Sequence, residues 1–487
     1  MKVSLGHVSA LALTVFLATI PFQWIALAGI GGLTFKPVHI ALILCIVVGV
    51  LVGMRFRLKE LLPKTVWQFI TLYMLYLAWE VAALSWSEDV TGAIQLVAKE
   101  WVYFTFSVAT LFAAIATVRR GVFIPSAGWG SALGLCAFLA YWYVQSKALG
   151  FNLFYEYAVA FTAGDVVKLQ HWFYLRLFNC DLSGLCDLGM EADDVMKANQ
   201  KNGIALVLIC YIVFLLVWMK QGLRRWIRIG GWALIILAAL LVVLSVSRSA
   251  IITLMLVGMM LIASAYSFSC RTEVRVSVLI FLGGFVLSGV VVFTVVEAFA
   301  SGVIGSRLAD LADDPRWVMY HNAFEAIGAR PFLGHGIGKE VADARGVENA
   351  VHNIFLGAWL QTGVLGLTLA VAWWFSLLRA WITVYLEGAP SANRDLWIAA
   401  TVLPIVPLAN VLQAGGGTFY LNDFFILGVF LGLATVIPVR PMARTKRFAS
   451  GVVERTSSSC RAGRNPVLRG PNADYRAQQS RSGTTFP

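Results

Sequence analysis

The chain has 487 residues, of which 59% are hydrophobic and only 13% are charged, and it contains 17 tryptophans. This composition excludes an ordinary soluble globular protein and indicates a protein of the lipid bilayer. The formal net charge of +12 comes largely from residues 439–487, which hold ten Lys and Arg and two acidic residues. That charge is therefore typical of a basic tail beside an anionic membrane surface, and it does not predict nucleic-acid binding.

Twelve apolar stretches each meet or nearly meet the roughly 20 residues that a helix needs to cross the hydrocarbon region. In chain order they are about 8–32, 37–54, 65–84, 91–118, 121–147, 201–219, 228–246, 248–268, 275–298, 362–386, 394–413 and 421–438. The first follows Lys2 but exceeds the length of a signal peptide, so we interpret it as a retained span. The sequence thus predicts an all-α polytopic membrane protein with about 12 transmembrane helices.

Lys and Arg concentrate in alternate connections between these stretches, which predicts the orientation of the chain. The basic connections contain Arg55, Arg57, Lys59, Lys64, Arg119, Arg120, Lys220, Arg224, Arg225, Arg228, Arg271 and Arg275. The positive-inside rule places them in the cytoplasm. Both termini are then cytoplasmic, and two long loops, about 148–200 and 299–361, lie on the outer face. We predict a membrane domain over 1–438 and a disordered basic cytoplasmic tail over 439–487.

Cysteine and histidine spacing bears on redox and metal chemistry. Cys180 and Cys186 share the first outer loop, and we predict a disulfide between them, with two free thiols as the alternative. No two histidines have the i, i+4 spacing of a helical metal pair, and there is no Cys-x-x-Cys. The sequence therefore predicts a site without metal or cofactor. The acid pair Glu88-Asp89 precedes the fourth stretch and is suited to capping its helix.

The most informative motif is His352-Asn353, followed after nine residues by Gly363 and after two more by Gly366. It begins where a polar loop meets an apolar helix. An imidazole there can accept a proton near neutral pH from a group in a water-accessible pocket. The alternative is that His352 caps a helix at the membrane interface. His321 is also followed by Asn, but the same spacing from it leads to Phe332 rather than to glycine.

Two arginines precede this motif on the predicted outer face. Arg248 lies in a Ser-Arg-Ser turn between the seventh and eighth stretches, and Arg316 opens an amphipathic segment that leads to Pro331 and a glycine-rich turn containing His335. A planar guanidinium binds phosphate oxygens in a bidentate manner. The alternatives are a lipid-headgroup anchor for Arg248 and a surface charge on a loop helix for Arg316.

In this order, the Ser-Arg-Ser turn, the Arg-Trp helix with its Gly-x-Gly turn and the His-Asn motif resemble the core of the O-antigen ligase and Wzy-type polymerase superfamily. The specific resemblance covers about residues 240–370, and the topology is similar over nearly all of 1–438. Residues 84–89 and the start of the sixth stretch at Lys201-Asn202-Gly203 are more loosely similar. One departure is that the family usually has an Arg shortly before this Asn. Here the nearby basic residues are Lys197 and Lys201, and the nearest upstream Arg is Arg176.

The resemblance implies a GT-C-like fold in the bacterial inner membrane, with the active site facing the periplasm. It implies transfer of a glycan from undecaprenyl pyrophosphate to an acceptor hydroxyl, on lipid A-core or a similar molecule, with inversion and without a metal. His352 would be the catalytic base, and Arg248 and Arg316 would bind the pyrophosphate. Secondary candidates for the site are Asn353, Asn202, Lys201, Arg176 and His335.

Three alternatives remain open. A Wzy-type polymerase of O-antigen or exopolysaccharide repeat units would use the same core residues, and so would a protein oligosaccharyltransferase. A transporter is the alternative that is not an enzyme. Its pathway would use the intramembrane residues Glu80, Lys99 and Glu100, which otherwise predict an ion pair between the third and fourth spans.

Overall fold

The structure of the chain is a computed structural model. It describes residues 4–23, 28–30, 33–55, 62–148, 155, 158–159, 162–163, 199–244, 248–270, 315–342, 346, 348–351, 353–388, 394–410 and 421–437. The elements are α1 Leu5–Thr19, η1 Ile20–Phe22, β1 Ala28–Ile30, β2 Leu33–Phe35, α2 Pro37–Arg55, α4 Lys64–Ala83, η2 Leu84–Trp86, α5 Val90–Arg119, α6 Phe123–Ala148, α9 Asn199–Met219, α10 Arg225–Leu244, α11 Arg248–Cys270, α14 Pro315–Ala329, β3 Val341–Ala342, β4 Glu348–Asn349, α15 Ile354–Glu387, α16 Arg394–Val402, α17 Ile405–Asn410 and α18 Leu421–Val436.

The predicted predominance of helices is confirmed, and several of the helices are suited to a multi-pass membrane protein. Within the described residues, seven helical segments are long and apolar enough to cross a membrane: Leu5–Phe22, Pro37–Met54, Lys64–Trp86, Val90–Arg119, Phe123–Tyr141, Arg225–Val242 and Ile354–Leu386. Three shorter apolar helical segments are Gly203–Met219, Ala250–Ser264 and Leu421–Val436. The total of twelve spans and the GT-C-like fold stay predictions, and the predicted span 275–298, Cys180, Cys186 and the tail 439–487 lie outside the described residues.

Two predicted spans differ from the helices observed. The first stretch, predicted to continue to residue 32, leaves the α-helix at Thr19 and enters the short 3-10 helix η1, which contains Pro21. The stretch 394–413 forms two short helices, α16 and α17, separated at Leu403 and Pro404. Proline cannot donate the backbone hydrogen bond of a continuous helix, so an interruption follows from the sequence at this position.

The expectation of an all-α protein needs a small correction. Within the described part of the chain, two antiparallel hairpins accompany the helices. In the first, Ala28 pairs with Phe35 and Ile30 with Leu33. In the second, Val341 of β3 pairs with Asn349 of β4. The second hairpin belongs to the predicted loop 299–361, which also contains α14 and the start of α15, so this loop is partly built from regular elements.

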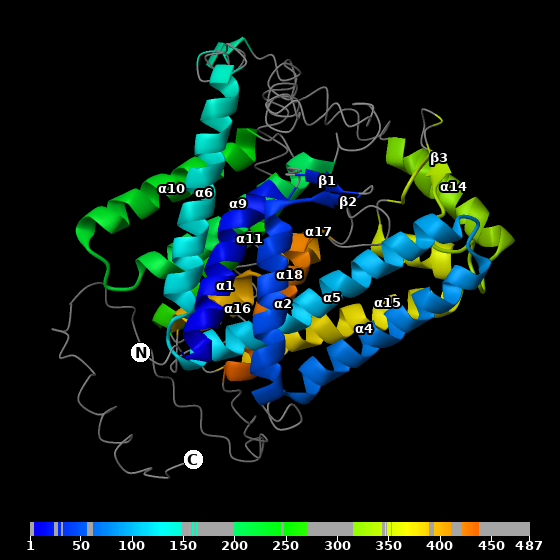
Figure 1. Cartoon of the computed structure of the whole chain (residues 1–487), viewed down its shortest axis with the longest axis horizontal. Coiled ribbons are helices and arrows are strands. Elements are labelled where there is room, and N and C mark those ends of the chain that lie inside the picture. Colours follow the sequence, from blue (N-terminus) through cyan, green and yellow to red (C-terminus); the bar gives the residue numbers. More distant parts are fainter. Residues whose placement is uncertain are drawn as a thin grey trace, which may run out of the picture. The chain divides into compact units, whose positions relative to one another are not determined.

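Helix α18 forms the centre of the bundle against α5 (Figure 1). Residues 421–434 of α18 are all buried. Gly428 and Gly432 lie four residues apart on the face toward α5, where an added Cβ atom at Gly432 would lie 2.8 Å from the carbonyl oxygen of Leu111. Small residues at this spacing let two membrane helices approach closely, because no side chain separates their backbones.

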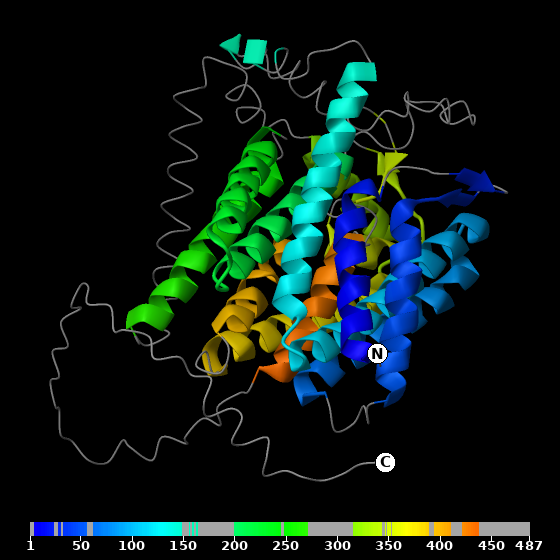
Figure 2. The same ribbon diagram turned by 60° about the vertical axis from the view of Figure 1, so that its left-hand side comes forward.

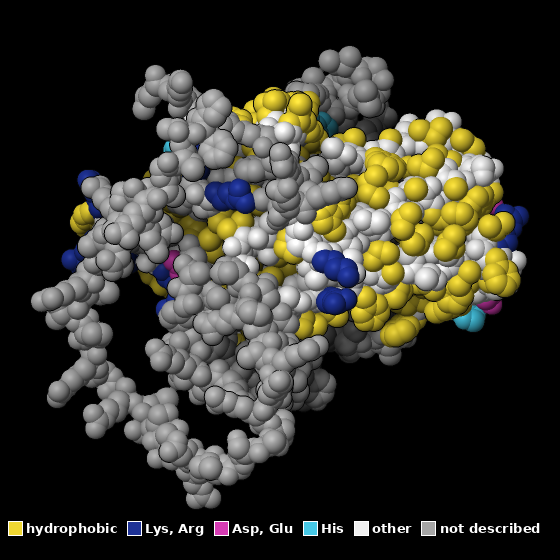
Figure 3. Space-filling view, turned by 90° about the horizontal axis from the view of Figure 1, so that it is seen from below, with side chains coloured by type: hydrophobic (Ala, Val, Ile, Leu, Met, Phe, Trp, Pro, Cys, Tyr) yellow, Lys and Arg dark blue, Asp and Glu magenta, His cyan; other side chains and the backbone are white. Residues whose placement is uncertain are grey.

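The remaining described helices pack around this pair. Helix α1 lies between α2 and α6, and α6 in turn contacts α9 (Figures 1 and 2). Helices α4 and α15 run alongside each other for much of their length. In the space-filling view of Figure 3, the described surface is mainly hydrophobic or uncharged, and Lys and Arg occur in small groups. Such a surface suits contact with lipid chains.

Candidate functional site

Helix α15 is broken at the first glycine of the His-Asn motif. Gly363 has φ 70° and ψ −168°, a conformation that residues with a side chain rarely adopt. A Cβ atom at this position would also overlap the carbonyl oxygen of Phe332. Glycine is therefore required here both by the backbone conformation and by the close approach of the glycine-rich turn.

The break exposes backbone carbonyls of α15, and the glycine-rich turn pairs with them. A helix end leaves its last carbonyl groups without partners in the same helix. The backbone N–H of His335 donates to the carbonyl oxygen of Leu360 at 2.8 Å, and that of Gly336 donates to Gln361 at 2.9 Å. The turn that follows Arg316 in the sequence is thus fixed directly onto the His-Asn-Gly-Gly helix.

Two tryptophans attach the end of α4 to the same region. Trp79 donates from Nε1 to the carbonyl oxygen of Thr362 at 2.9 Å. Trp86 in η2 donates to the carbonyl oxygen of Leu333 at 3.0 Å. The two indole rings lie 5.7 Å apart between centroids. The segment 84–89, which loosely resembles the family pattern, therefore contacts the glycine-rich turn in space, although nearly 250 residues separate them in sequence.

The polar residues after η2 continue this contact. The backbone N–H of Ile337 donates to the hydroxyl oxygen of Ser87 at 2.8 Å, in a buried position. Lys339 forms an ion pair with Glu88 at 3.3 Å. Because the Ser87 bond is shielded from water, it contributes more to positioning than the ion pair, which is largely exposed.

A polar cleft of about 490 Å³ opens beside this contact. Asp89 caps α5 by accepting from the backbone N–H of Gly92 at 3.0 Å, as predicted for the acid pair. Partial burial and the nearby carboxylate of Glu348 raise the pKa of Glu340 above its usual value. The residues that line the cleft are Glu88, Asp89, Gly92, Ala93, Gln95, Leu96, His335, Ile337, Gly338, Lys339, Glu340 and Glu348.

The Asn of the His-Asn pair has a clear structural role. Asn353 caps α15, and its Oδ1 accepts hydrogen bonds from the backbone N–H groups of Phe355 and Leu356, each at 3.0 Å. The preceding Val351 is 1% exposed. His352 itself lies outside the described residues. Because Asn353 supplies the cap, the alternative that His352 caps this helix is not needed to explain how α15 begins.

The two arginines both begin helices. Arg248 is the first residue of α11 and Arg316 is the second residue of α14. Lys201 and Asn202 lie in the first turn of α9. The side chains of these four residues, and the whole of Arg176, lie outside the described part of the structure. The N-terminal end of a helix carries a partial positive charge, so each of these positions favours a nearby anion.

The remaining two histidines of the region lie in different settings. His335 donates from Nε2 to the carbonyl oxygen of Ala326 at 2.8 Å, which ties the glycine-rich turn to α14. His321, which like His352 is followed by Asn, lies 3.2 Å from the carboxylate of Glu325, four residues later on the same helix. Both side chains are largely exposed. His321 therefore has the environment of a surface residue.

A hydrogen bond, rather than the predicted ion pair of Lys99 with an acidic residue, joins the third and fourth predicted spans, α4 and α5. Tyr73 of α4 donates from its hydroxyl to Glu100 of α5 at 2.6 Å. Glu80 and Glu100 are 5% and 3% exposed. Lys99 instead lies with Nζ 5.7 Å from the ring centroid of Tyr103 on its own helix. Both acids lie buried in helices that are long and apolar enough to span a membrane, and the sequence does not identify Tyr73 as the partner of Glu100.

Comparison with known proteins identifies the region that carries these features. Residues 232–371 match the model of a protein family described as O-antigen ligase. The matched region contains Arg248, Arg316, the glycine-rich turn and the complete motif from His352 to Gly366. A comparison with curated proteins found no match.

Proposed function

We propose that this protein transfers a glycan from undecaprenyl pyrophosphate to an acceptor hydroxyl. The match of residues 232–371 to the O-antigen ligase family supports this assignment to the O-antigen ligase and Wzy superfamily. The acceptor is lipid A-core or a similar molecule. The observation that carries the proposal is the family match itself, because the matched region contains His352, Arg248 and Arg316, the three residues to which we assign the reaction. The reaction takes place at the periplasmic face of the bacterial inner membrane, with both termini in the cytoplasm.

In the proposed step, His352 accepts the proton of the acceptor hydroxyl while the hydroxyl oxygen forms a bond with the anomeric carbon of the donor glycan. The bond from this carbon to the pyrophosphate oxygen breaks, and the lipid pyrophosphate leaves with the electron pair. One displacement at the anomeric carbon inverts its configuration. The protonated imidazole then returns its proton to solvent.

Arg248 and Arg316 neutralise the charge that develops on the leaving pyrophosphate. Guanidinium groups bind phosphate oxygens through charge-assisted, often bidentate hydrogen bonds. The positions of both residues at the beginnings of α11 and α14 support this role, since each helix adds a positive N-terminal field. With two arginines and two helix ends, the proposed reaction needs no divalent metal.

The polar cleft beside the glycine-rich turn supports binding of the sugars. Its carboxylates, among them Glu88, Asp89 and Glu348, are hydrogen-bond acceptors that suit glycan hydroxyl groups. The cleft shares His335 and Ile337 with the turn that is fixed on α15. A glycan held there would therefore contact the same turn that connects α14 with the motif helix.

A Wzy-type polymerase is the second candidate, because the same family region and the same residues would serve an acceptor that is itself a lipid-linked glycan. A deletion strain separates the candidates. Loss of a ligase leaves polymerised glycan on the lipid carrier and none on lipid A-core, whereas loss of a polymerase leaves single repeat units on the carrier. Loss of glycan only from proteins would indicate an oligosaccharyltransferase.

Transfer by the purified protein then distinguishes an enzyme from a transporter. The protein is reconstituted with the donor glycolipid and an acceptor isolated from the deletion strain. A new glycan-acceptor product, formed with release of the lipid pyrophosphate, is expected. Movement of the donor across the bilayer without any new product would contradict the proposal.

A further inference from the structure

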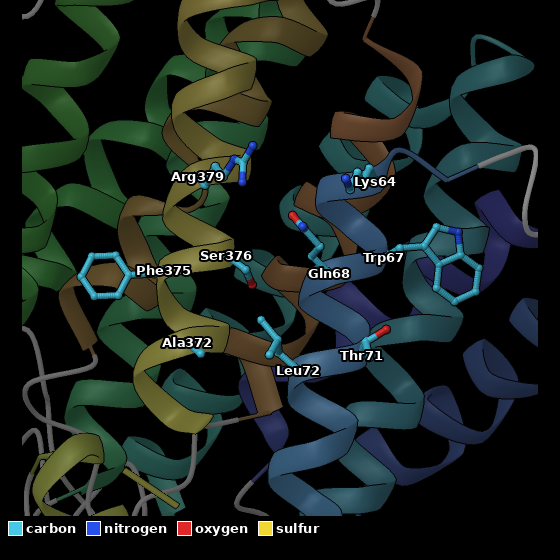
Figure 4. A pocket seen from close by; sticks show the side chains of 9 residues that line it. All are labelled: Lys64, Trp67, Gln68, Thr71, Leu72, Ala372, Phe375, Ser376 and Arg379. Atoms are coloured by element: carbon cyan, nitrogen blue, oxygen red, sulfur yellow. The ribbon is translucent and has the colours of Figure 1, made fainter. Parts of the chain in front are cut away.

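A groove of about 550 Å³ separates α4 from α15 at the ends of these helices that lie away from the candidate site. This volume lies in the range of about 300–1,000 Å³ that is common for small-molecule sites. Figure 4 shows side chains from both helices around it. The lining residues are Lys64, Trp67, Gln68, Thr71, Leu72, Ala372, Phe375, Ser376 and Arg379.

One end of the groove is positively charged. Lys64 and Arg379 come from opposite walls and lie near the same end in Figure 4. Both side chains are exposed, and no acidic side chain among the described residues forms an ion pair with either of them. Lys64 is also the first residue of α4, whose N-terminus has no side-chain cap. The groove therefore presents two uncompensated cations beside a helix end that itself favours an anion.

Polarity decreases along the groove away from this charged end. Gln68 and Ser376 project toward the space between the two walls, and Leu72 and Ala372 line the opposite end (Figure 4). The groove thus has a charged, a polar and an apolar zone in that order. This order is complementary to a molecule in which an anionic group is followed by hydrogen-bonding esters and then by a hydrocarbon chain. A free phosphate ion would use only the first zone.

Aromatic side chains on the two outer edges complete the groove. Trp67 and Phe375 point outward on opposite sides in Figure 4, and Phe375 is 61% exposed. Both α4 and α15 belong to segments long and apolar enough to span a membrane. Trp67 is half-buried, whereas the exposed ring of Phe375 on such a helix suits contact with lipid at the edge of the groove.

We propose that this groove binds an anionic glycerophospholipid, with its phosphate between Lys64 and Arg379 and an acyl chain along Leu72 and Ala372. The site is separate from the candidate transfer site. About 15 residues of α4 lie between Lys64 and Trp79, which corresponds to roughly 22 Å along the helix. The lipid joins the charged ends of the two helices, whereas Trp79 and Thr362 join their other ends.

Binding is measured by native mass spectrometry of the full chain in mild detergent, with phosphatidylglycerol and with uncharged-headgroup phosphatidylcholine. The wild-type protein is expected to prefer phosphatidylglycerol. Lys64→Gln with Arg379→Gln is expected to weaken its binding roughly 30-fold, and each single variant roughly fivefold. The matched control, Arg224→Gln with Arg225→Gln, removes two exposed cations outside the groove and should leave binding unchanged.

Two further arms test the apolar zone and the source of the phosphate. Ala372→Trp retains both cations and fills the far end of the groove, so it should also weaken phosphatidylglycerol binding. Glycerol phosphate, which has no acyl chain, should not compete at the same concentration. Equal loss in the control variant, no loss with Ala372→Trp, or full competition by glycerol phosphate would each overturn the proposed lipid site. If the double variant does not fold, phosphatidylglycerol binding by the two single variants tests the proposal instead.

Discussion

Trp79 on α4 donates a hydrogen bond to the carbonyl oxygen of Thr362, a residue 283 positions later in the chain. This carbonyl is available because Gly363 interrupts the helical hydrogen bonding of α15. The glycine of the motif and the tryptophan of α4 therefore form one structural unit. A spacing that resembles a catalytic signature also encodes the place where the third span attaches to the motif helix.

His352→Ala is expected to abolish glycan transfer by the purified protein, with a loss of about 10²–10⁴-fold, because the reaction loses its general base. The matched control is His321→Ala, which removes the other His-Asn histidine at an exposed position. The control should retain near-normal activity and an unchanged elution profile. Activity retained by His352→Ala would show that the proposed base is wrong.

The arginines are expected to act through geometry as well as charge. Arg248→Lys and Arg316→Lys keep the positive charge but lose the planar fork, so both should transfer glycan more slowly, and the Ala variants more slowly still. Transfer rates are measured with and without EDTA. A requirement for a divalent metal in the wild-type protein would contradict the proposed mechanism.

Gly363→Ala should destabilise the protein by about 1–3 kcal/mol through backbone strain, since alanine is strained at a positive φ. Overlap of its Cβ with the carbonyl oxygen of Phe332 should add to this loss. Gly258 offers a matched control within α11, because an added Cβ there meets nothing within 4 Å. Gly258→Ala should be neutral or stabilising by up to about 1 kcal/mol. Thermal unfolding in detergent measures both, and equal effects would refute the role of the break.

Glu340→Gln tests the electrostatics of the polar cleft. Burial and Glu348 raise the pKa of Glu340, so the native state favours its neutral form. Ionisation of Glu340 therefore costs stability as the pH rises above the usual glutamate range, and this cost is absent at lower pH, where both states are protonated. Glu340→Gln should raise the melting temperature relative to wild type at neutral pH, and the difference should vanish in acid. A difference independent of pH would exclude this cause.

Much of the helical framework follows from the sequence because apolar length alone determines a membrane helix. The stretches 37–54, 65–84 and 91–118 correspond to α2, α4 and α5 within a few residues. The predicted span 394–413 does not include the interruption between α16 and α17, although Pro404 marks it. The predicted span 362–386 begins later than α15, which starts at Ile354 and is interrupted at Gly363, close to the predicted start.

The candidate site was only partly predictable. Residue types and spacing selected His352, Gly363 and Gly366, because those are local features of the chain. The pairing of Trp79 with Thr362 and of Ser87 with Ile337 depends on segments far apart in sequence. No local periodicity encodes such contacts, and the Ser87 hydroxyl resembles any other loop serine until the turn is folded against it.

The close packing of α18 against α5 has a consequence for biosynthesis. Helix α5 emerges from the ribosome early, whereas α18 is the last described helix to be made. In the folded protein, Ser107 and Thr110 of α5 are nearly inaccessible to solvent. The glycines of α18 pack against this face of α5, so the face is uncovered until α18 is made. The interior of the bundle therefore closes only after α18 has been made, and until then this face of α5 must be covered by lipid or by the insertion machinery.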